Sequence, residues 1–204
     1  MIKIYGHPQT SAGRCYWLME ELGLKYQQVP LDMKAGEHKS PEYLKLNPNG
    51  KIPCLIDDDL VLWESMAINH YLTEKHKPEL FGSGLKEKAR TMQWNYWAIV
   101  EYQKPLIDML IQMIFVPEPK RDHEVIKKSR ERAIVLNELL DQELSGKNYL
   151  IQHDFTLADL NVASVAKINK MTQIDISQLK NLDSWLNKVC ERPAHLKLDE
   201  LGKS

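Results

Sequence analysis

One stretch of the chain combines main-chain and charged groups that suit the binding of a peptide-like ligand. Residues 47–56 read Asn-Pro-Asn-Gly-Lys-Ile-Pro-Cys-Leu-Ile, a turn-forming loop that runs into a short apolar strand. Pro53 begins that strand and offers the sheet no N–H donor, which suits an edge, a bulge or a turn. A cis Ile52–Pro53 bond would turn the N–H and C=O of Ile52 outward, where they can pair with an extended peptide.

Charged and hydroxyl side chains stand close to this segment in the sequence or before a predicted helix. Lys51 precedes the Ile-Pro pair, and Glu64 and Ser65 open a predicted helix shortly after it. Near the N-terminus, Thr10 and Ser11 stand in a loop before another predicted helix. Ser and Thr are favoured helix N-caps whether or not they take part in chemistry, so capping is the alternative for each hydroxyl.

The elements around these residues predict a small α/β unit in the first part of the chain. One clean apolar face, formed by Cys15, Leu18, Met19 and Leu22, predicts the first helix, which Gly23 closes. Alternating or short apolar runs predict the strands. The predicted strands are residues 2–5, 26–31, 54–56 and 60–63, and the predicted helices end near residues 22, 47 and 77. The order is therefore β-α-β-α-β-β-α.

A linker rich in Pro, Gly and Ser follows, and beyond it the pattern is entirely helical. We expect domains at residues 1–78 and 86–204, with the linker at 79–85. Thr156 and Asp159 form a capping-box-like signature, which we interpret as structural, before a helix that is apolar nearly all round and is therefore expected to be central and buried. The helical patterns cover residues 90–113, 124–144, a stretch that begins at 156, and 182–189.

The composition is that of a globular protein and argues against several classes. The chain has 204 residues, of which 43% are hydrophobic and 27% are charged. Its net charge of −1 argues against electrostatic binding to nucleic acid or to acidic membranes. A strand pattern begins at residues 2–5 without a long apolar segment before it, and no run approaches a membrane span. We therefore expect neither a signal peptide nor a membrane helix. Three widely spaced cysteines favour a reduced, cytoplasmic setting without disulfides.

Four pieces of sequence, taken in order, carry a family resemblance. They are residues 10–13 (Thr-Ser-Ala-Gly), 47–53 (Asn-Pro-Asn-Gly-Lys-Ile-Pro), 64–68 (Glu-Ser-Met-Ala-Ile) and 155–159 (Phe-Thr-Leu-Ala-Asp). With these gaps, before an all-helical half, the chain resembles the cytosolic glutathione S-transferases over essentially its full length, and most of all bacterial members with Ser or Thr in the active-site loop. The resemblance implies a thioredoxin-like N-terminal domain, an α-helical C-terminal domain, glutathione as co-substrate without another cofactor, and a homodimer.

The resemblance implies a hydroxyl that ionises the glutathione thiol. A thiol with a pKa of about 8.5 needs roughly 2.7 kcal/mol of preferential thiolate stabilisation to reach a pKa of about 6.5. A hydroxyl hydrogen bond together with a helix N-terminus can supply it. By position in the active-site loop, Ser11 ranks first as the catalytic residue and Thr10 second. Tyr5, at the end of the first strand, is a third candidate, with packing in the fold as its alternative.

The resemblance also assigns the binding of glutathione by position. The backbone of Ile52 before Pro53 should pair with the cysteinyl part of the ligand. Glu64 and Ser65 should hold the γ-glutamyl end, because a helix N-terminus suits its carboxylate and Glu64 suits its ammonium group.

Three further residues match outer parts of the family's site. His38 and Lys51 correspond to positions that bind the glycine carboxylate in some classes, with an exposed surface role as the alternative. Tyr102, in an aromatic helix, would wall the pocket for a hydrophobic electrophile, whereas most of that helix is expected to serve core or dimer packing.

The cysteines and histidines are interpreted as structural. Cys15 lies on the apolar stripe of the first helix, where free Cys commonly acts as a small core residue. Cys54 and Cys190 have no recognisable activating partner in the sequence. The histidines show no metal-ligand spacing, so we assign no metal.

The leading hypothesis is a glutathione S-transferase whose bound thiolate attacks a small hydrophobic electrophile. A glutathione-dependent disulfide reductase or peroxidase would share the site and differ in the second substrate. A non-catalytic, transferase-like binding module is the third possibility. The intact pairs Ile52-Pro53 and Glu64-Ser65 weigh against that module, which would need neither.

Overall fold

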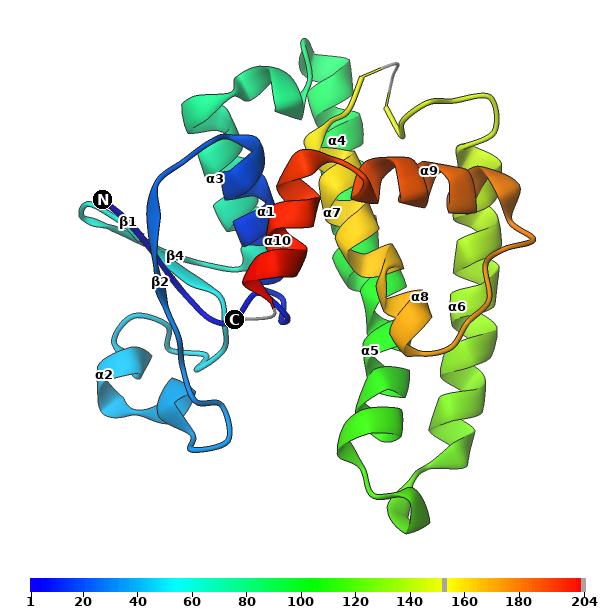
Figure 1. Ribbon diagram of the computed structural model, residues 1–204, viewed down its shortest axis with the longest axis horizontal. Coiled ribbons are helices and arrows are strands. Elements are labelled where there is room, and N and C mark those ends of the chain that lie inside the picture. Colours follow the sequence, from blue (N-terminus) through cyan, green and yellow to red (C-terminus); the bar gives the residue numbers. More distant parts are fainter. Residues whose placement is uncertain (152–153, 203–204) are drawn as a thin grey trace. The chain divides into compact units, whose positions relative to one another are not determined.

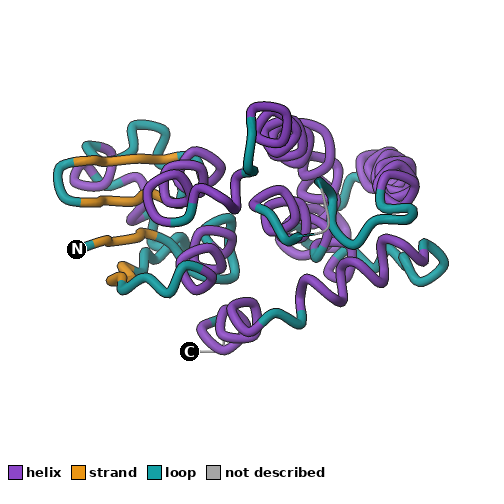
Figure 2. The backbone as a smooth tube through the Cα atoms, turned by 90° about the horizontal axis from the view of Figure 1, so that it is seen from above, coloured by secondary structure: helices purple, strands orange, loops and turns teal. Residues whose placement is uncertain are grey.

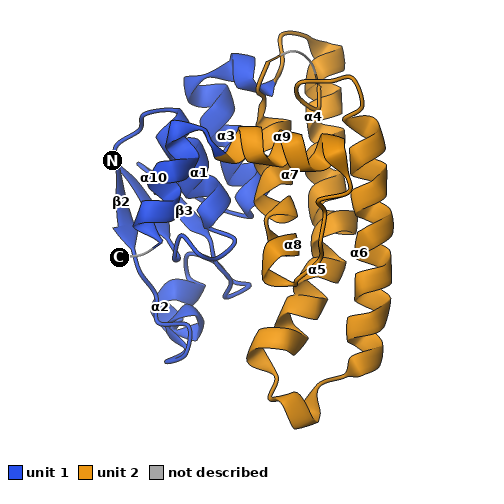
Figure 3. Ribbon diagram, turned by 45° about the vertical axis from the view of Figure 1, so that its right-hand side comes forward, with its two compact units in different colours: residues 1–81, 191–204 blue, residues 82–190 orange. Residues whose placement is uncertain are grey.

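The computed structural model of the chain describes residues 1–151 and 154–202 and divides into two compact units (Figure 3). Unit 1 holds Met1–Phe81 together with the C-terminal segment that begins at Glu191, and unit 2 holds Gly82–Cys190. The sequence pattern assigns residues 86–204 to one helical domain. The structure groups the last segment with unit 1 instead, because α10 (Pro193–Leu201) packs against α1 (Gly13–Glu21).

Unit 1 is built on a four-stranded mixed sheet, drawn in orange in Figure 2. β1 pairs in parallel with β2 and antiparallel with β3, while β3 and β4 form the predicted hairpin. The predicted second strand ends at Val29, because Pro30 has no N–H for the ladder. The strands are β1 (Ile2–Tyr5), β2 (Tyr26–Val29), β3 (Cys54–Asp57) and β4 (Leu60–Trp63), in the order β2-β1-β3-β4.

Helices α1, α3 (Ser65–His76) and α10 cover the core of unit 1, and α1 packs against both of the others (Figure 1). Cys15, Leu18 and Met19 of the predicted apolar face are fully buried, whereas Leu22 is the C-cap of α1 and is half-buried. The 3₁₀ segment η1 (Glu37–Lys39) and the short helix α2 (Pro41–Leu44) precede the loop that enters β3. A second 3₁₀ segment, η2 (Pro78–Phe81), occupies part of the predicted linker.

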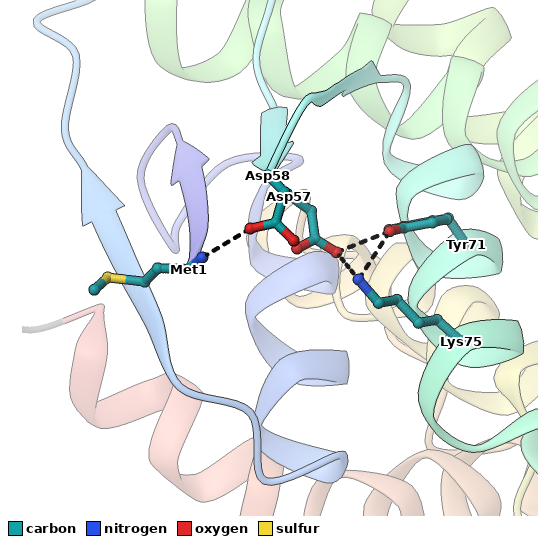
Figure 4. A network of polar contacts seen from close by, with 5 residues as sticks. All are labelled: Met1, Asp57, Asp58, Tyr71 and Lys75. Carbon is teal, nitrogen blue, oxygen red and sulfur yellow. Dashed lines mark hydrogen bonds and ion pairs between the residues drawn. The ribbon is translucent and has the colours of Figure 1, made fainter.

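The turn between β3 and β4 is tied to α3 by polar side chains (Figure 4). Asp57 Oδ2 accepts a hydrogen bond from the Tyr71 hydroxyl at 2.8 Å and forms an ion pair with Lys75. Burial acts to raise the pKa of Asp57, but the donors from Lys75 and Tyr71 outweigh it and hold that pKa below its usual value. At the same turn, the Met1 amino group binds Asp58 at 3.3 Å. The hairpin is thereby anchored to the helix that begins at Ser65.

Unit 2 is helical. Its helices are α4 (Leu85–Trp97), α5 (Gln103–Leu110), α6 (His123–Glu143), α7 (Leu157–Ala166), α8 (Ile168–Met171) and α9 (Lys180–Cys190). The π-helical segments η3 (Ala98–Tyr102) and η4 (Ile111–Phe115) extend α4 and α5. The helical stretch predicted at 90–113 therefore begins earlier, at Leu85, and ends later, at Phe115. The 3₁₀ segment η5 (Glu118–Lys120) follows it. In the described part of the chain, no helix is both long enough and apolar enough to span a membrane.

The capping signature before α7 acts structurally, as predicted. Asp159 is wholly buried and accepts hydrogen bonds from the backbone N–H of Thr156 at 2.9 Å and of Leu150 at 2.8 Å. It also accepts one from the indole of Trp185 in α9, at 2.9 Å. One carboxylate therefore joins three segments of unit 2 around α7, which is buried along most of its length, as its apolar pattern predicts.

Candidate functional site

The entry to β3 holds its main-chain groups in a defined direction. The Ile52–Pro53 bond is cis, the arrangement considered from the sequence. The carbonyl of Lys51 accepts a hydrogen bond from the Tyr43 hydroxyl at 2.6 Å and a second from Asn47 Nδ2 at 2.7 Å. Because the Lys51–Ile52 peptide is trans, the N–H of Ile52 points away from these two donors. The donors therefore orient the main-chain group that was predicted to read a ligand.

Asn47 organises the loop before that entry. Its side chain is buried, and its Oδ1 accepts the backbone N–H of Asn49 at 3.0 Å while its Nδ2 holds Lys51. Gly50 adopts φ +55°, and a Cβ there would lie 2.8 Å from the Lys39 side chain and 2.9 Å from the His38 carbonyl. The loop therefore needs glycine at this position.

The close approach at Gly50 brings the two predicted glycine-carboxylate residues into one region. The backbone of His38 lies against Gly50, which directly precedes Lys51. The Nδ1 atom of His38 is buried and finds no hydrogen-bond partner among the residues that the structure describes. The Lys51 side chain is exposed and available to an anion.

The two hydroxyls of the loop before α1 have different partners. Thr10 Oγ1 donates to the carbonyl of His7 at 2.6 Å and accepts the N–H of Ala12 at 3.2 Å, so this hydroxyl closes the loop on itself. Ser11 Oγ, which is half-buried, donates to the carbonyl of Ile52 at 2.9 Å. The N-cap of α1 is Ala12, and no described side chain caps this helix, so the capping alternative fails for both hydroxyls.

The loop between β1 and α1 therefore touches the entry to β3. Ser11 and Ile52 stand 41 positions apart in the sequence, and the structure joins them by one hydrogen bond. Gly13 makes the close packing of this loop possible, because a Cβ at that position would lie 2.3 Å from the carbonyl oxygen of Pro8.

Glu64 and Ser65 stand at the junction of β4 and α3. Glu64 is the N-cap and has φ +73°, which is unusual for a residue with a side chain and is found preferentially at functional sites. Its side chain is exposed. Ser65 is buried and is the first residue of α3 instead of its cap, so the interpretation of Ser65 as a plain N-cap is wrong.

A buried cation, which the sequence patterns did not single out, lies behind this junction. Arg14 in α1 is 5% exposed. Burial lowers its pKa to about 10, and the negative charge of Glu64 acts in the opposite direction. The Arg14 guanidinium thus contributes positive potential close to Glu64 from inside unit 1.

Two of the cysteines are placed where a thiol is inert. Burial raises the pKa of Cys15 to about 12, although the charge of Arg14 opposes this. Burial also raises the pKa of Cys54 to about 11. A nucleophilic cysteine needs a lowered pKa, so neither side chain is suited to covalent catalysis. The structure confirms the core position predicted for Cys15.

The two tyrosines considered from the sequence have packing roles. The ring of Tyr5 lies 5.7 Å from that of Tyr43, between centroids, beside the loop that enters β3. Tyr102 is wholly buried, its hydroxyl donates to Asn137 Oδ1, and it accepts a hydrogen bond from Asn169 Nδ2 at 2.8 Å. No surface of Tyr102 is open to a ligand in this structure, so its burial does not support the predicted role in an electrophile pocket.

The structure thus assembles most of the predicted residues of unit 1 and adds others. It joins Ser11 to Ile52 and brings His38 beside the loop of Lys51, while Asn47, Tyr43 and Arg14 were missed. The Asn-Pro-Asn-Gly run is typical of a turn in which the first Asn side chain binds the backbone of its own loop, so Asn47 could have been predicted. No local pattern in the sequence indicates the roles of Tyr43 or Arg14. Among the described residues, no group of three or more His, Cys, Asp or Glu side chains could hold a metal ion.

Comparisons with known proteins agree with the geometry. Residues 1–74 match the model of the glutathione S-transferase N-terminal domain, and residues 104–193 match that of the C-terminal domain. A probable glutathione S-transferase of Oryza sativa subsp. japonica is 33% identical over 99% of this chain and 97% of its own. Glutathione S-transferase 1 of Zea mays is also 33% identical, over 99% of this chain and 97% of its own.

Solved structures with the same fold include glutathione transferase F2 from Populus trichocarpa. It has a TM-score of 0.92 and 28% identity, with 100% of this chain and 99% of that chain covered. The theta class glutathione S-transferase from Xanthomonas axonopodis pv. citri, solved with glutathione bound, has a TM-score of 0.89 and 30% identity, with 96% and 95% covered. These matches confirm the predicted fold class, a thioredoxin-like domain followed by an α-helical domain.

Proposed function

The chain belongs to the glutathione S-transferase family, and we propose that it binds glutathione along the entry to β3 and the start of α3 and ionises its thiol for attack on an apolar electrophile. One observation carries the proposal: the Ser11 hydroxyl lies 2.9 Å from the Ile52 carbonyl, the main-chain group assigned to the cysteinyl residue. A catalytic hydroxyl must lie beside the residue whose thiol it activates, and this contact meets that requirement.

The cysteinyl residue of glutathione pairs with the main chain of Ile52 in this proposal. The N–H of Ile52 donates to the cysteinyl carbonyl, and the carbonyl of Ile52 accepts the cysteinyl N–H. The orientation of the Lys51–Ile52 peptide by Tyr43 and Asn47 supports this pairing, because a donor held in place loses little entropy when it binds.

The γ-glutamyl end carries an ammonium group and a carboxylate, and the start of α3 offers a partner for each. Glu64 is exposed and can bind the ammonium group. The first N–H groups of α3, from Ser65 onward, suit the carboxylate. Arg14 adds positive potential behind them, which favours an anion at this place.

The glycine carboxylate is assigned to His38 and Lys51. The exposed Lys51 ammonium supplies a charge, and the His38 segment lies beside the same loop. The two side chains would hold the end of the ligand opposite to Glu64, so the peptide would lie extended across the entry to β3.

Ser11 is the proposed donor to the thiolate. Within the described residues its hydroxyl donates to the Ile52 carbonyl, at the proposed place of the cysteinyl residue. Thr10 is less suited because its hydroxyl already donates and accepts within the loop. The hydroxyl of Tyr5 is not needed, since the packing of its ring against Tyr43 accounts for this residue.

The inert cysteines favour a transferase over a reductase that works through a cysteine of its own. A reductase of that kind needs a thiolate as nucleophile, whereas burial raises the pKa of both Cys15 and Cys54. In a transferase the only thiolate is that of glutathione. The electrophile is assigned by class alone, as a small apolar molecule.

We also propose a homodimer. The outer face of α4 and η3 exposes three large apolar residues four positions apart, Met92 (37%), Tyr96 (57%) and Val100 (63%). Aromatic residues and Met are enriched in protein interfaces. Light scattering of the native protein and of a Tyr96→Glu, Val100→Glu variant tests this assignment, which expects a dimer and a monomer respectively. A dimer that survives the double substitution would remove this face from the interface.

The proposed cellular setting is the cytoplasm. The three cysteines are free of disulfides, as expected for a reducing compartment, and the proposed co-substrate is reduced glutathione. Fractionation of the source cells tests this assignment, and recovery of the protein outside the cytoplasmic fraction would contradict it.

Two assays test the proposed function together. The protein should be retained on immobilised glutathione and eluted by the free ligand, and it should conjugate glutathione to a chloronitrobenzene-type electrophile. Hydroxyethyl disulfide serves as the alternative substrate. Failure to bind glutathione at millimolar concentration would exclude both enzyme hypotheses, and turnover of the disulfide alone would exclude the transferase.

A further inference from the structure

The Ser11 hydroxyl has one proton, and the structure shows where that proton is used. Ser11 Oγ donates to the Ile52 carbonyl at 2.9 Å, across the interval between two separate loops. A hydroxyl group is a donor to one partner at a time. While this bond exists, Ser11 cannot also donate to a sulfur atom.

The acceptor in this bond is the same group that the cysteinyl N–H of glutathione would use. The bond between Ser11 and the Ile52 carbonyl is partly buried, so this carbonyl would lose a donor at a partly shielded place if Ser11 simply turned away. Leaving such a carbonyl without a partner costs free energy. An incoming N–H removes that cost, because it provides a replacement donor at the same oxygen.

We propose that glutathione releases its own catalytic hydroxyl: the cysteinyl N–H replaces the Ser11 O–H at the Ile52 carbonyl, and the freed O–H turns to the glutathione sulfur. This inference rests on the proposed function. No covalent bond to the protein forms or breaks, and the thiol proton passes to solvent. Before ligand binds, the hydroxyl is held beside the cysteinyl position by its bond to Ile52.

The exchange is specific to Ser11 among the two loop hydroxyls. Thr10 Oγ1 is bound to the His7 carbonyl at 2.6 Å and to the Ala12 N–H at 3.2 Å, both within its own loop. Neither partner belongs to the proposed path of glutathione, so ligand binding offers Thr10 no replacement. The cysteinyl N–H therefore couples peptide recognition to thiol ionisation through Ser11 alone.

A glutathione analogue with an ester in place of the γ-glutamyl–cysteinyl amide tests the coupling. This change removes the N–H and keeps the length of the ligand. The pKa of the bound thiol is measured from its ultraviolet thiolate absorbance across pH, at saturating ligand, and compared with that of each free ligand. The coupling is one neutral hydrogen bond, so the lowering of the pKa on binding should be smaller for the ester by roughly 0.5 to 1 unit.

The Ser11→Ala variant provides the matched control. Without the hydroxyl there is nothing to release, so glutathione and its ester should show the same lowering of the pKa. Ser11→Thr keeps a hydroxyl and should restore the difference. An equal lowering for both ligands in the wild-type protein would overturn the exchange while leaving the proposed function intact, whereas absence of thiolate with glutathione itself would overturn both.

Crystal structures with and without glutathione give a second, independent reading. The ligand-free crystal should contain the bond between Ser11 Oγ and the Ile52 carbonyl. In the complex the two atoms should lie beyond hydrogen-bond distance, with Oγ turned to the sulfur. A complex in which Ser11 still donates to Ile52 would contradict the exchange, whatever the titrations give.

Discussion

Arg192, the N-cap of α10, binds Glu21 at the end of α1 through hydrogen bonds of 2.7 Å from Nε and 2.8 Å from Nη2. The residues stand 171 positions apart, and Glu21 is 9% exposed at its side chain. A bidentate, largely buried pair of this kind is stronger than a mobile surface pair. It joins α10 to α1, the helix that follows the loop of Thr10 and Ser11.

A double-mutant cycle on this pair should reveal its contribution. Arg192→Ala and Glu21→Ala, alone and together, should give a coupling free energy of about 1 kcal/mol or more in denaturant unfolding. The exposed pair Lys147–Glu143 is the matched control and should give no more than about 0.5 kcal/mol. Equal coupling in the two cycles would mean that the contact between α1 and α10 does not depend on this ion pair.

Asn47 should support both the fold and the binding of glutathione. Asn47→Ala removes the donor to Lys51 and the acceptor for Asn49 N–H, so we expect unfolding to become easier by about 1–3 kcal/mol. Because the Lys51–Ile52 peptide loses its orientation, glutathione affinity should fall by about fivefold to tenfold. Calorimetric titration and denaturant unfolding measure the two effects. Asn49→Ala, at an exposed side chain of the same loop, should change neither.

The Asp57 anchor predicts a loss of stability in acid. The folded-state pKa of Asp57 lies below its unfolded value of about 3.9, so its contribution is complete above that pH and is lost as the pH falls toward the folded-state pKa. Lys75 has a raised pKa, chiefly through its bond to Asp57, and stays charged throughout this range. Asp57→Asn should lower the melting temperature at neutral pH and flatten its dependence on pH below about 4.

Asp58 is the control for that experiment (Figure 4). Its partner is the Met1 amino group, and both side chains are 75% exposed. Asp58→Asn should therefore leave the melting temperature and its acid dependence close to those of the wild-type protein. If both substitutions flatten the pH dependence of the melting temperature in acid equally, this dependence does not arise from the buried carboxylate of Asp57.

The cysteines should differ in reactivity. Cys15 and Cys54 are buried with raised pKa values, whereas Cys190 in α9 is half-buried. A thiol reagent should label at most Cys190 in the native protein and all three after unfolding, as peptide mass spectrometry can show. Cys15→Ala should keep the ability to conjugate glutathione. Rapid native labelling of Cys15 would contradict its assignment to the core.

Local patterns were sufficient to predict the four strands and most of the longer helices. The strand alternation of residues 2–5, the apolar face with Cys15 and the helical second half all follow from short-range spacing. The position of Pro53 at the start of a strand suggested a cis bond as one possibility, and the structure has that bond. These features depend on neighbours in the sequence, where periodicity and turn chemistry act directly.

Contacts between distant segments were beyond such patterns. The sequence pattern assigned residues up to 204 to the helical domain and predicted no helix after 182–189, whereas α10 forms beyond it and packs against α1. Local spacing does not reveal which core a segment near the C-terminus will join. The sequence predicts Tyr102 in a ligand pocket, but this side chain is buried and its hydroxyl forms hydrogen bonds with Asn137 and Asn169. Tyr43 and Asn47 were missed as supports of Lys51 because their contacts depend on how the loop folds back.

Titration of the bound glutathione thiol shows whether Ser11 ionises it. Thiolate absorbance should be followed across pH for wild-type protein, Ser11→Ala and Thr10→Val at saturating glutathione. Loss of a hydrogen bond to a charged sulfur should raise the pKa of the bound thiol in Ser11→Ala by about 1–2 units, with affinity little changed. Thr10→Val should lower the melting temperature and leave that pKa in place. A pKa that is unchanged in Ser11→Ala and raised in Thr10→Val would contradict the role proposed for Ser11 and assign the catalytic hydroxyl to Thr10.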